Sequence, residues 1–200
     1  MKKFVLAFAT AVMCVGGAFA QLSMGSKVGL NLSSLTGDGT NYKAGVNVGV
    51  FANYRINNLL AIQPEFLYSM QGTTFDDVKI LTETLKSTYT SHYLDIPVLL
   101  KVYPWAGLNV QFGPQFGFCV DDEYKVKLGS EEVSSKDLEK YGYDNKAETF
   151  DFSLAVGLGY EFDFGMTVDA RYNFGLTKVY DNSDSKNGVF MLSLGYKFDF

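Results

Sequence analysis

Cysteine and histidine are scarce in this chain of 200 residues, which contains two cysteines and a single histidine. Only Cys119 remains after the first 20 residues, so the rest of the chain has no internal disulfide, and a small secreted domain held together by disulfides is not expected. One histidine leaves no room for a histidine-rich metal site. We therefore expect neither a metal nor an organic cofactor.

Positive charge is also in short supply. Residues 21–200 carry 15 lysines and arginines against 22 aspartates and glutamates, which gives a net charge of −7. An acidic chain without a basic cluster lacks the electrostatic footprint of a nucleic-acid-binding protein. We therefore expect no nucleic acid among its partners.

Long apolar runs are missing beyond the start of the chain. Residues 1–20 combine a short basic start, an apolar run from Phe4 to Val15, and small residues up to Ala20. That layout is typical of a cleaved secretory signal peptide, and the run is shorter than the roughly 20 apolar residues of a spanning helix. We expect a signal peptide at 1–20 and one exported domain at 21–200.

Apolar and polar residues alternate through much of the remaining chain, and this alternation predicts strands with two different faces. The clearest cases are residues 108–120 and 150–160. Polar residues and glycines interrupt every later apolar stretch, so within a membrane only a closed barrel would satisfy the backbone hydrogen bonds. The pattern predicts about eight strands, at residues 26–33, 43–54, 59–71, 88–103, 107–120, 148–160, 165–176 and 187–200.

The connections between these segments alternate in length. Tight connections are expected at 55–58, 104–106 and 161–164, and long polar ones at 34–42, 72–87, 121–147 and 177–186. Short periplasmic turns, longer external loops and an even number of strands are typical of bacterial outer-membrane barrels. We interpret 121–147 as a solvated loop, in which residues 133–141 have the composition for a turn or two of helix.

The composition of the polar face indicates which side of the barrel faces outward. A soluble barrel of the lipocalin kind also alternates, but it keeps its apolar face inside. Here the polar positions are mostly Gly, Ser, Asn, Ala and Gln, which suit the crowded interior of a narrow eight-stranded barrel. The sequence therefore predicts an all-β, single up-and-down antiparallel barrel that spans the outer membrane.

Aromatic residues make up 16% of the chain and gather near the predicted strand ends. Two aromatic girdles are expected on a transmembrane barrel because amphipathic rings favour the headgroup level. The terminal Phe200 follows an alternating segment and resembles the C-terminal signal that outer-membrane barrels present to their assembly machinery. We expect Tyr54, Trp105, Tyr160, Phe198 and Phe200 at the periplasmic level, and Tyr68, Phe118, Phe150, Phe174 and Phe190 at the outer level.

Four motifs follow one another along the chain: YLDIPVLLK at 93–101, GP at 113–114, VGLGYEF at 156–162 and ARYNFGL at 170–176. Their order and spacing resemble the PorT-like outer-membrane β-barrel family. The resemblance covers essentially the whole of residues 21–200. It implies an outer-membrane barrel without a catalytic motif, and some members of the family take part in protein secretion across the outer membrane.

Several charged residues fall on the face expected to point inward. Because buried charges persist only when they are paired, we predict an internal salt-bridge network that fills the barrel. Its centre would be Arg171. The alternative is a polar permeation path, although an eight-stranded barrel is just filled by its own side chains. The partners of Arg171 would be Glu65, Asp95, Asp151 or Asp169, and the same face carries Lys27, Lys101, Lys197 and Asp199.

Two further patterns have the residue types of a chemical site but not its geometry. Ser91 and His92 are neighbours on one predicted strand, where adjacent side chains point to opposite faces and do not pair as in a hydrolase. The acidic groups at 76–77, 121–123 and 181–184 lack the spacing of a calcium-binding loop. We interpret them as solvated loop residues and expect no enzyme and no metal site.

The leading functional hypothesis is a non-enzymatic role in outer-membrane structure, adhesion or interaction through the long loops. Its expected partners are outer-membrane lipid, the barrel-assembly machinery and an envelope or secretion protein. One alternative is a conduit for small solutes. Another is an accessory component of an outer-membrane protein secretion system, which rests on the family resemblance alone.

Overall fold

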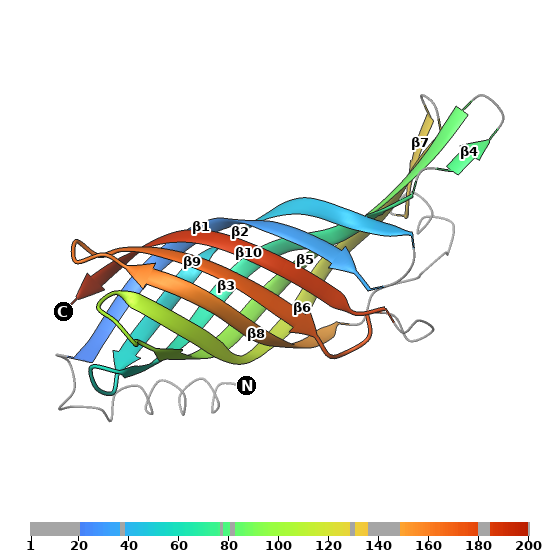
Figure 1. The fold of residues 1–200 in the computed structure, drawn as a ribbon. Helices are drawn as coiled ribbons and strands as arrows, with labels where there is room; N and C mark the ends of the chain where they lie inside the picture. The colour runs from blue at the N-terminus through green and yellow to red at the C-terminus, as the bar shows by residue number, and fades with distance from the viewer. Residues whose placement is uncertain are drawn as a thin grey trace.

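The chain folds into a closed β-barrel whose strands cross it obliquely, as the computed structural model in Figure 1 shows. Within the described residues, no helix is both long and apolar enough to cross a membrane. The predicted signal peptide at 1–20 and the terminal Phe200 lie outside the described residues. The structure describes residues 21–36, 39–76, 78–80, 83–128, 131–135, 149–179 and 185–199.

Eight long strands build the barrel wall, and two short strands stand beside them at one end. The short strands are β4 (Val78–Ile80) and β7 (Glu131–Ser134). The eight long strands confirm the predicted fold class. They are β1 (Leu22–Leu35), β2 (Thr40–Arg55), β3 (Leu60–Phe75), β5 (Glu83–Val102), β6 (Leu108–Leu128), β8 (Phe150–Glu161), β9 (Met166–Gly175) and β10 (Asn187–Asp199).

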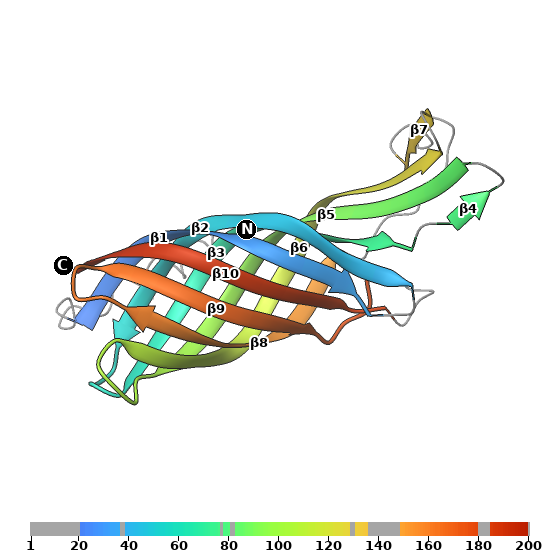
Figure 2. The same cartoon turned by 45° about the horizontal axis from the view of Figure 1, so that its top comes forward.

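The ring closes because the first and last strands pair. Each long strand lies antiparallel to the next one along the chain, and β1 pairs with β10 from Ser23↔Asp199 to Leu35↔Asn187. Figure 2 shows this seam, with β1 and β10 side by side along the length of the barrel. A closed wall has no open strand edge, which is the condition for a β-structure to lie in hydrocarbon.

Tight turns join the strands at the end of the barrel where β1 begins and β10 ends. They occupy residues 56–59, 103–107 and 162–165. Gly107 and Gly165 have φ angles of +78° and +92°, a region in which glycine meets no Cβ clash. The three turns agree with the predicted short connections to within one residue at each boundary, which is less than the usual error of boundaries predicted from sequence.

The opposite end of the barrel, which we call the outer end, differs from the prediction. β5 and β6 continue past the rest of the wall as a long ribbon, at the upper right of Figures 1 and 2. They stay paired from His92↔Asp121 out to Leu85↔Leu128. β3 accompanies β5 as far as Thr74↔Thr88, and further out β4 lies along β5 and β7 along β6. We call residues 78–80, 83–91, 121–128 and 131–134 the outer extension.

Several predicted loops are therefore wrong in part. Much of 72–87 and the first part of 121–147 is strand, and residues 133 and 134 lie in β7 rather than in a helix. Residues 136–148 lie outside the described residues. The connection expected at 34–42 shortens to residues 36–39, because β1 and β2 are both longer than predicted.

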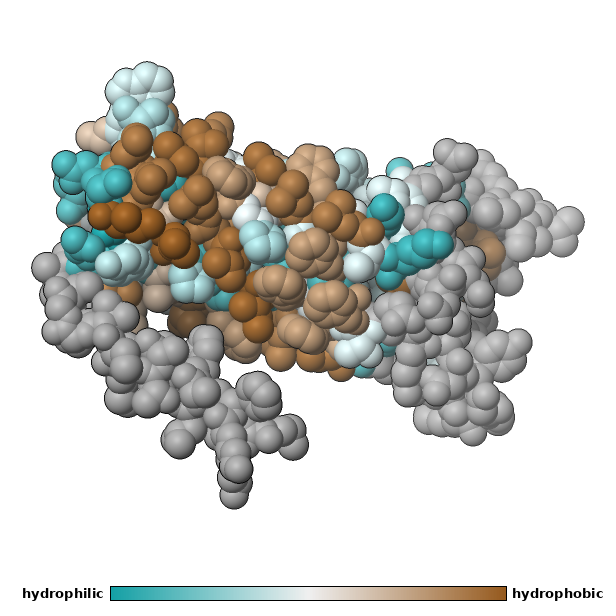
Figure 3. Space-filling model, turned by 90° about the horizontal axis from the view of Figure 1, so that it is seen from below, coloured by the Kyte–Doolittle hydropathy of each residue, from teal (hydrophilic) through white to brown (hydrophobic). Residues whose placement is uncertain are grey.

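Burial separates the two faces of the wall. Inward-facing positions such as Asn31, Asn47 and Gln111 have essentially no exposed surface, whereas Val28 and Leu30 on the other face are 58% and 63% exposed. On the face that Figure 3 shows, apolar side chains form a brown band across the barrel. A polar interior and an apolar exterior confirm the predicted orientation of the barrel and exclude the lipocalin-like alternative.

Candidate functional site

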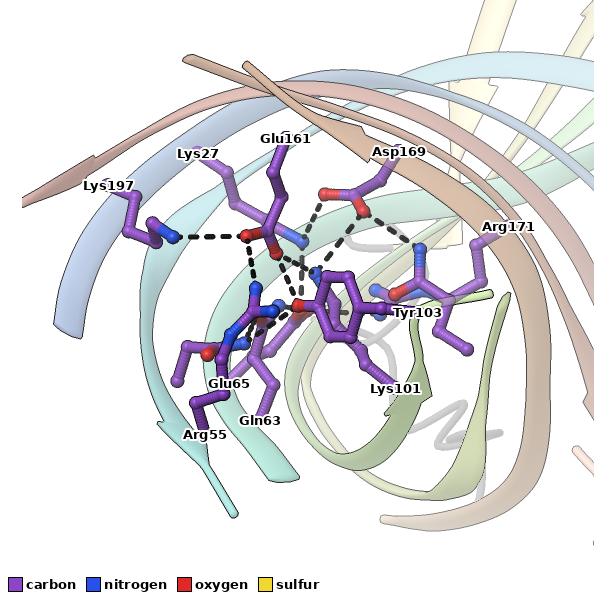
Figure 4. Close-up of polar contacts among 12 residues, drawn as sticks. Lys27, Arg55, Gln63, Glu65, Lys101, Tyr103, Glu161, Asp169, Arg171 and Lys197 are labelled. Carbon is purple, nitrogen blue, oxygen red and sulfur yellow. Dashed lines mark hydrogen bonds and ion pairs between the residues drawn. The ribbon is translucent and has the colours of Figure 1, made fainter. Parts of the chain in front are cut away.

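The interior of the barrel holds a group of ion pairs in the half nearest the tight turns, which Figure 4 shows in close-up. Glu65 on β3 is its first centre. Its Oε1 lies 2.8 Å from the Nζ of Lys27 on β1, and its Oε2 lies 3.1 Å from the Nη1 of Arg171 on β9. Gln63 donates a further hydrogen bond of 2.7 Å to Oε1. Both oxygens of the Glu65 carboxylate are thus paired with a cation.

Glu161, the last residue of β8, is the second centre. The Nη2 of Arg55 and the Nζ of Lys197 lie 3.2 and 3.0 Å from its Oε2. The hydroxyl of Tyr103 donates to its Oε1 over 2.6 Å. The guanidinium of Arg55 also lies over the Tyr103 ring, 3.9 Å from its centroid, a favourable cation–π geometry. These side chains come from the ends of three strands and from the turn at 103–107, and they lie together beside the tight turns.

Asp169 connects the two centres. Its carboxylate lies 3.2 Å from Lys27 and 3.7 Å from Lys101, and it accepts a 2.8 Å hydrogen bond from Gln111. Lys101 in turn reaches Oε1 of Glu161 at 3.5 Å. We call Lys27, Arg55, Glu65, Lys101, Glu161, Asp169, Arg171 and Lys197 the interior network. Such a buried set is costly to disrupt, because removing one partner leaves an uncompensated charge.

Two predicted partners of Arg171 lie outside this network. Asp95 accepts a 3.2 Å hydrogen bond from Gln71, and Asp151 accepts bonds from Thr177 and Asn187 at 3.2 and 3.3 Å. No ion pair of either carboxylate is found among the described residues. Both lie further toward the outer end than Glu65 and Asp169. The prediction that Arg171 stands at the centre was also wrong, because Glu65, Asp169 and Glu161 are the residues that each join several cations.

Sequence analysis missed two members of the interior network. Glu161 was assigned to a tight connection, and Arg55 to another. The period-2 pattern could have placed Glu161 on the inner face, because it lies two residues after Gly159, which is an inward-facing position of β8. The side chain of Asp199 is not described.

Apart from Asp95 and Asp151, the side chains that fill the rest of the described interior are uncharged. In the middle, Asn31 donates 3.0 Å hydrogen bonds to Ser69 Oγ and to the carbonyl of Met70, and Asn47 donates to Asn31 Oδ1 over 2.6 Å. Buried apolar side chains fill further parts of the lumen in two groups. One contains Leu67, Val189 and Met191, and the other contains Leu35, Tyr89 and Val179. The interior is therefore a packed core, as expected for eight strands.

Ser91 and His92 lie as their alternation predicts. The Ser91 side chain is fully buried inside the barrel, whereas His92 lies on the outer surface. His92 Nδ1 is 2.6 Å from the hydroxyl of Tyr68, and the two rings stack at 5.8 Å. The arrangement does not bring the serine to the histidine. Among the described residues, no group of three or more His, Cys, Asp or Glu side chains is placed to hold a metal ion.

The comparison with protein families decides which class of barrel this is. The model of the family described as "Outer membrane protein beta-barrel domain" matches residues 19–181. The chain belongs to this family. It is therefore an outer-membrane β-barrel protein, and its place is the cell outer membrane. No curated protein matches the chain.

Solved structures of outer-membrane barrels are similar to this one. Ail, the attachment invasion locus protein of Yersinia pestis, is 18% identical, over 88% of this chain and 98% of that chain, with a TM-score of 0.48. OprG from Pseudomonas aeruginosa is 15% identical, over 90% and 95%, with a TM-score of 0.46. Neisserial surface protein A is 15% identical, over 88% and 97%, with a TM-score of 0.42.

The outer-membrane barrel carries aromatic side chains toward both ends of its apolar surface. Beside the tight turns, Trp105 is 71% exposed, Tyr160 and Phe198 are exposed, and Tyr54 is half-buried. The rings of Tyr160 and Phe162 and those of Tyr196 and Phe198 are in edge contact at 4.8 Å. Toward the outer end, the exposed aromatics include Tyr68, Phe118, Phe150, Phe174 and Phe190. Their role as membrane girdles stays a prediction.

Proposed function

We propose that this outer-membrane barrel is a non-enzymatic interaction protein, in which the barrel is a rigid anchor and the outer extension is the binding element. The observation that carries the proposal is the continuous pairing of β5 with β6 out to Leu85↔Leu128, past the last pair of β6 with β8 (Phe118↔Phe150) and the last pair of β3 with β5 (Thr74↔Thr88). Eight residue pairs, from His92↔Asp121 to Leu85↔Leu128, hold this ribbon in one shape. An ordered ribbon loses less conformational entropy on binding than a free loop would.

The two faces of the outer extension differ in chemistry. Directly opposed residues in an antiparallel pair share a face, so Lys86 and Lys127 lie together, as do Thr88 and Lys125. The other face continues from the barrel interior and pairs Tyr89 with Tyr124 and Ser87 with Val126. Phe75 packs edge-on against Tyr124 at 5.9 Å. The extension therefore offers a partner its polar, lysine-bearing face, whereas Tyr89 on the other face is buried against Leu35 and Val179.

The packed interior argues against the alternative of a small-solute conduit. A solute on its way through the lumen would have to displace the interior network and the apolar groups outside it. Conductance in planar lipid bilayers separates the two functions, because a conduit gives steps of ion current and a filled barrel does not.

The second alternative, an accessory role in protein secretion, rests on the resemblance to PorT-like barrels. It predicts stable co-purification with other components of a secretion complex. The leading proposal also predicts partners, but these depend on the outer extension. A partner that binds only from the periplasmic side, at the tight turns, would favour the secretion role.

The test is a trimmed variant in which residues 76–86 and 125–147 are each replaced by a two-residue Asn-Gly turn. Such turns close antiparallel hairpins, and the first would follow the Thr74↔Thr88 pair. We expect the trimmed barrel to keep its heat-modifiable mobility on gels. After chemical cross-linking in outer membranes, proteins attached to the intact chain should be missing from the trimmed one. Identical cross-linked partners for both chains would overturn the proposal.

A further inference from the structure

A cleft lies where the outer extension leaves the barrel wall, at the upper right of Figures 1 and 2. β3 pairs with β5 as far as Thr74↔Thr88, and β4 takes up the pairing only from Leu85↔Val78. Residues 86–87 of β5 lie in the interval between the two pairings and line the cleft. Its volume is about 490 Å³, within the range of about 300–1,000 Å³ that is usual for small-molecule sites.

Short polar side chains dominate the lining of this cleft. Thr74 on β3 is directly opposite Asn41 on β2 and Thr88 on β5, so one amide and two hydroxyls stand side by side on one face of the sheet. The neighbouring residues Thr73 and Tyr89 have almost no exposed surface and belong to the inner face, so this row faces outward. The polar lining consists of Asn41, Thr74, Asp76, Lys86, Ser87 and Thr88.

Contacts with the barrel hold the lining of the cleft in place. Asn41 Nδ2 donates a 2.7 Å hydrogen bond to Oδ1 of Asp76, and the backbone N–H of Asp76 donates to the carbonyl of Gly39 over 2.9 Å. Phe75, the one aromatic residue of the lining, packs against the buried apolar group that contains Leu35. A site whose polar groups are already positioned loses less conformational entropy when a ligand binds.

We propose that this cleft binds a saccharide through the sugar hydroxyls. Its lining combines a carboxylate, an amide and three hydroxyls, a set that both donates and accepts hydrogen bonds, as the neighbouring hydroxyls of a sugar do. Phe75 is the one apolar side chain of the lining, which disfavours an apolar ligand. Asp76 and Lys86 balance each other in charge, which disfavours a simple ion. The inference rests on the proposed function, because the cleft lies on the polar face of the outer extension.

Two more lysines lie on the same face beside the cleft and do not line it. Lys127 is directly opposite Lys86, and Lys125 is directly opposite Thr88. Lys125 also lies 3.5 Å from Glu123. Lysines on an exposed face attract any polyanion, and salt screens that attraction. Hydrogen bonding inside the cleft is therefore distinguished from charge attraction beside it by its dependence on Asn41 and Thr88 and by its resistance to salt.

The test is binding of the folded, fluorescently labelled barrel in detergent micelles to an array of immobilised neutral and acidic oligosaccharides. We expect retention on at least one neutral oligosaccharide, with an affinity that falls about tenfold in Asn41→Leu and in Thr88→Val, the loss of roughly one hydrogen bond. Thr90→Val is the matched control and should bind like the wild type, because Thr90 lies on the same face of β5, is also half-buried and does not line the cleft. Retention on no oligosaccharide, or equal losses in Thr88→Val and Thr90→Val, would overturn the proposal.

The trimmed barrel, tested on the same array, separates this inference from the proposed function. All variants should remain heat-modifiable, which shows that they are folded. Binding that is lost in the trimmed barrel but kept in Asn41→Leu and Thr88→Val would reject the cleft and leave the outer extension as the binding element. Binding to acidic oligosaccharides alone, abolished by high salt and kept in both cleft variants, would assign it to the lysines and also reject the cleft. Binding that persists in the trimmed barrel would contradict both proposals.

Discussion

The Nζ of Lys27 lies 2.8 Å from Oε1 of Glu65, and both side chains are almost completely shielded from solvent. Arg171 approaches the other oxygen of the same carboxylate at 3.1 Å. One carboxylate therefore pairs with two cations that are far apart in the sequence, Lys27 on β1 and Arg171 on β9. Inside a narrow barrel this arrangement ties three strands together through a single group.

Replacing Glu65 by glutamine should destabilise the barrel strongly. The amide keeps the shape but loses the charge, so Lys27 and Arg171 are left with one carboxylate fewer in a region without bulk water. We expect the free energy of unfolding to fall by roughly 3–5 kcal/mol, the range for breaking a buried ion pair. Urea titration of the refolded protein in detergent micelles measures this change.

The control for that substitution is Glu123→Gln in the outer extension. Glu123 lies 3.5 Å from Lys125, and both side chains are partly exposed. Exposed pairs of this kind contribute at most about 1 kcal/mol. Equal effects of Glu65→Gln and Glu123→Gln would contradict the account, since burial is what distinguishes the two sites.

Arg171→Ala should lower the melting temperature of the barrel. The substitution leaves Glu65 with Lys27 as its one remaining cation and removes the guanidinium that also contacts the sulfur of Met191 at 3.5 Å. Arg55→Ala is a useful comparison because the Arg55 side chain is 34% exposed, so its loss is partly offset by solvent. Heating the samples before gel electrophoresis gives both transitions. An unchanged melting temperature for Arg171→Ala would reject the interior network as a stabilising element.

Trp105 is the single tryptophan of the chain and lies in the turn at 103–107. If the aromatics beside the tight turns lie at the headgroup level, its fluorescence should be quenched most by lipids brominated near the headgroup. Lipids brominated deep in the acyl chain should quench it less. The reverse order would place this end of the barrel inside the hydrocarbon, and equal weak quenching would place Trp105 in water. Trp105→Phe supplies the background signal.

We expect no difference between the wild type and His92→Ala in their activity on lipid esters. The Ser91 side chain faces the interior and His92 faces outward, so no nucleophile–base pair forms between them. The stacked contact with Tyr68 is partly exposed, and its loss should change stability only slightly. Hydrolysis that is present in the wild type and abolished in His92→Ala would contradict the non-enzymatic proposal.

The alternation of faces was enough to predict the barrel. In β6 and β8, residues 108–120 and 150–160 alternate apolar with polar or small residues, and both segments are strands in the structure. Lipid on one side and a crowded lumen on the other impose this pattern on every strand within the membrane. The strand number and the orientation of the barrel followed from the pattern.

The outer extension was missed because the prediction relied on this alternation of apolar and polar residues. Both faces of the segment 121–128 are accessible to water. Charged residues such as Asp122 and Lys125 therefore occur on both faces, and apolar and polar residues no longer alternate. Local sequence then resembles a solvated loop, although cross-strand pairing with β5 holds it as a strand. Long-range pairing of this kind leaves little local signal.

Individual contacts in the interior were also only partly predictable. Alternation assigned Asp95 and Asp151 to the inner face correctly, and both are buried. It gave no information on their height along the barrel axis, which depends on strand tilt and register. For that reason it placed them with Arg171, whereas their hydrogen bonds are to Gln71, Thr177 and Asn187.

The most direct test of the central claim is the mobility of the protein from outer-membrane fractions on a gel, unheated beside a boiled sample. A closed transmembrane barrel with a filled interior resists the detergent, so the unheated sample should migrate as a compact band that shifts on boiling. Planar bilayers containing the same preparation should show no steps of ion current. A protein that appears in the soluble periplasmic fraction without a heat shift would contradict the account.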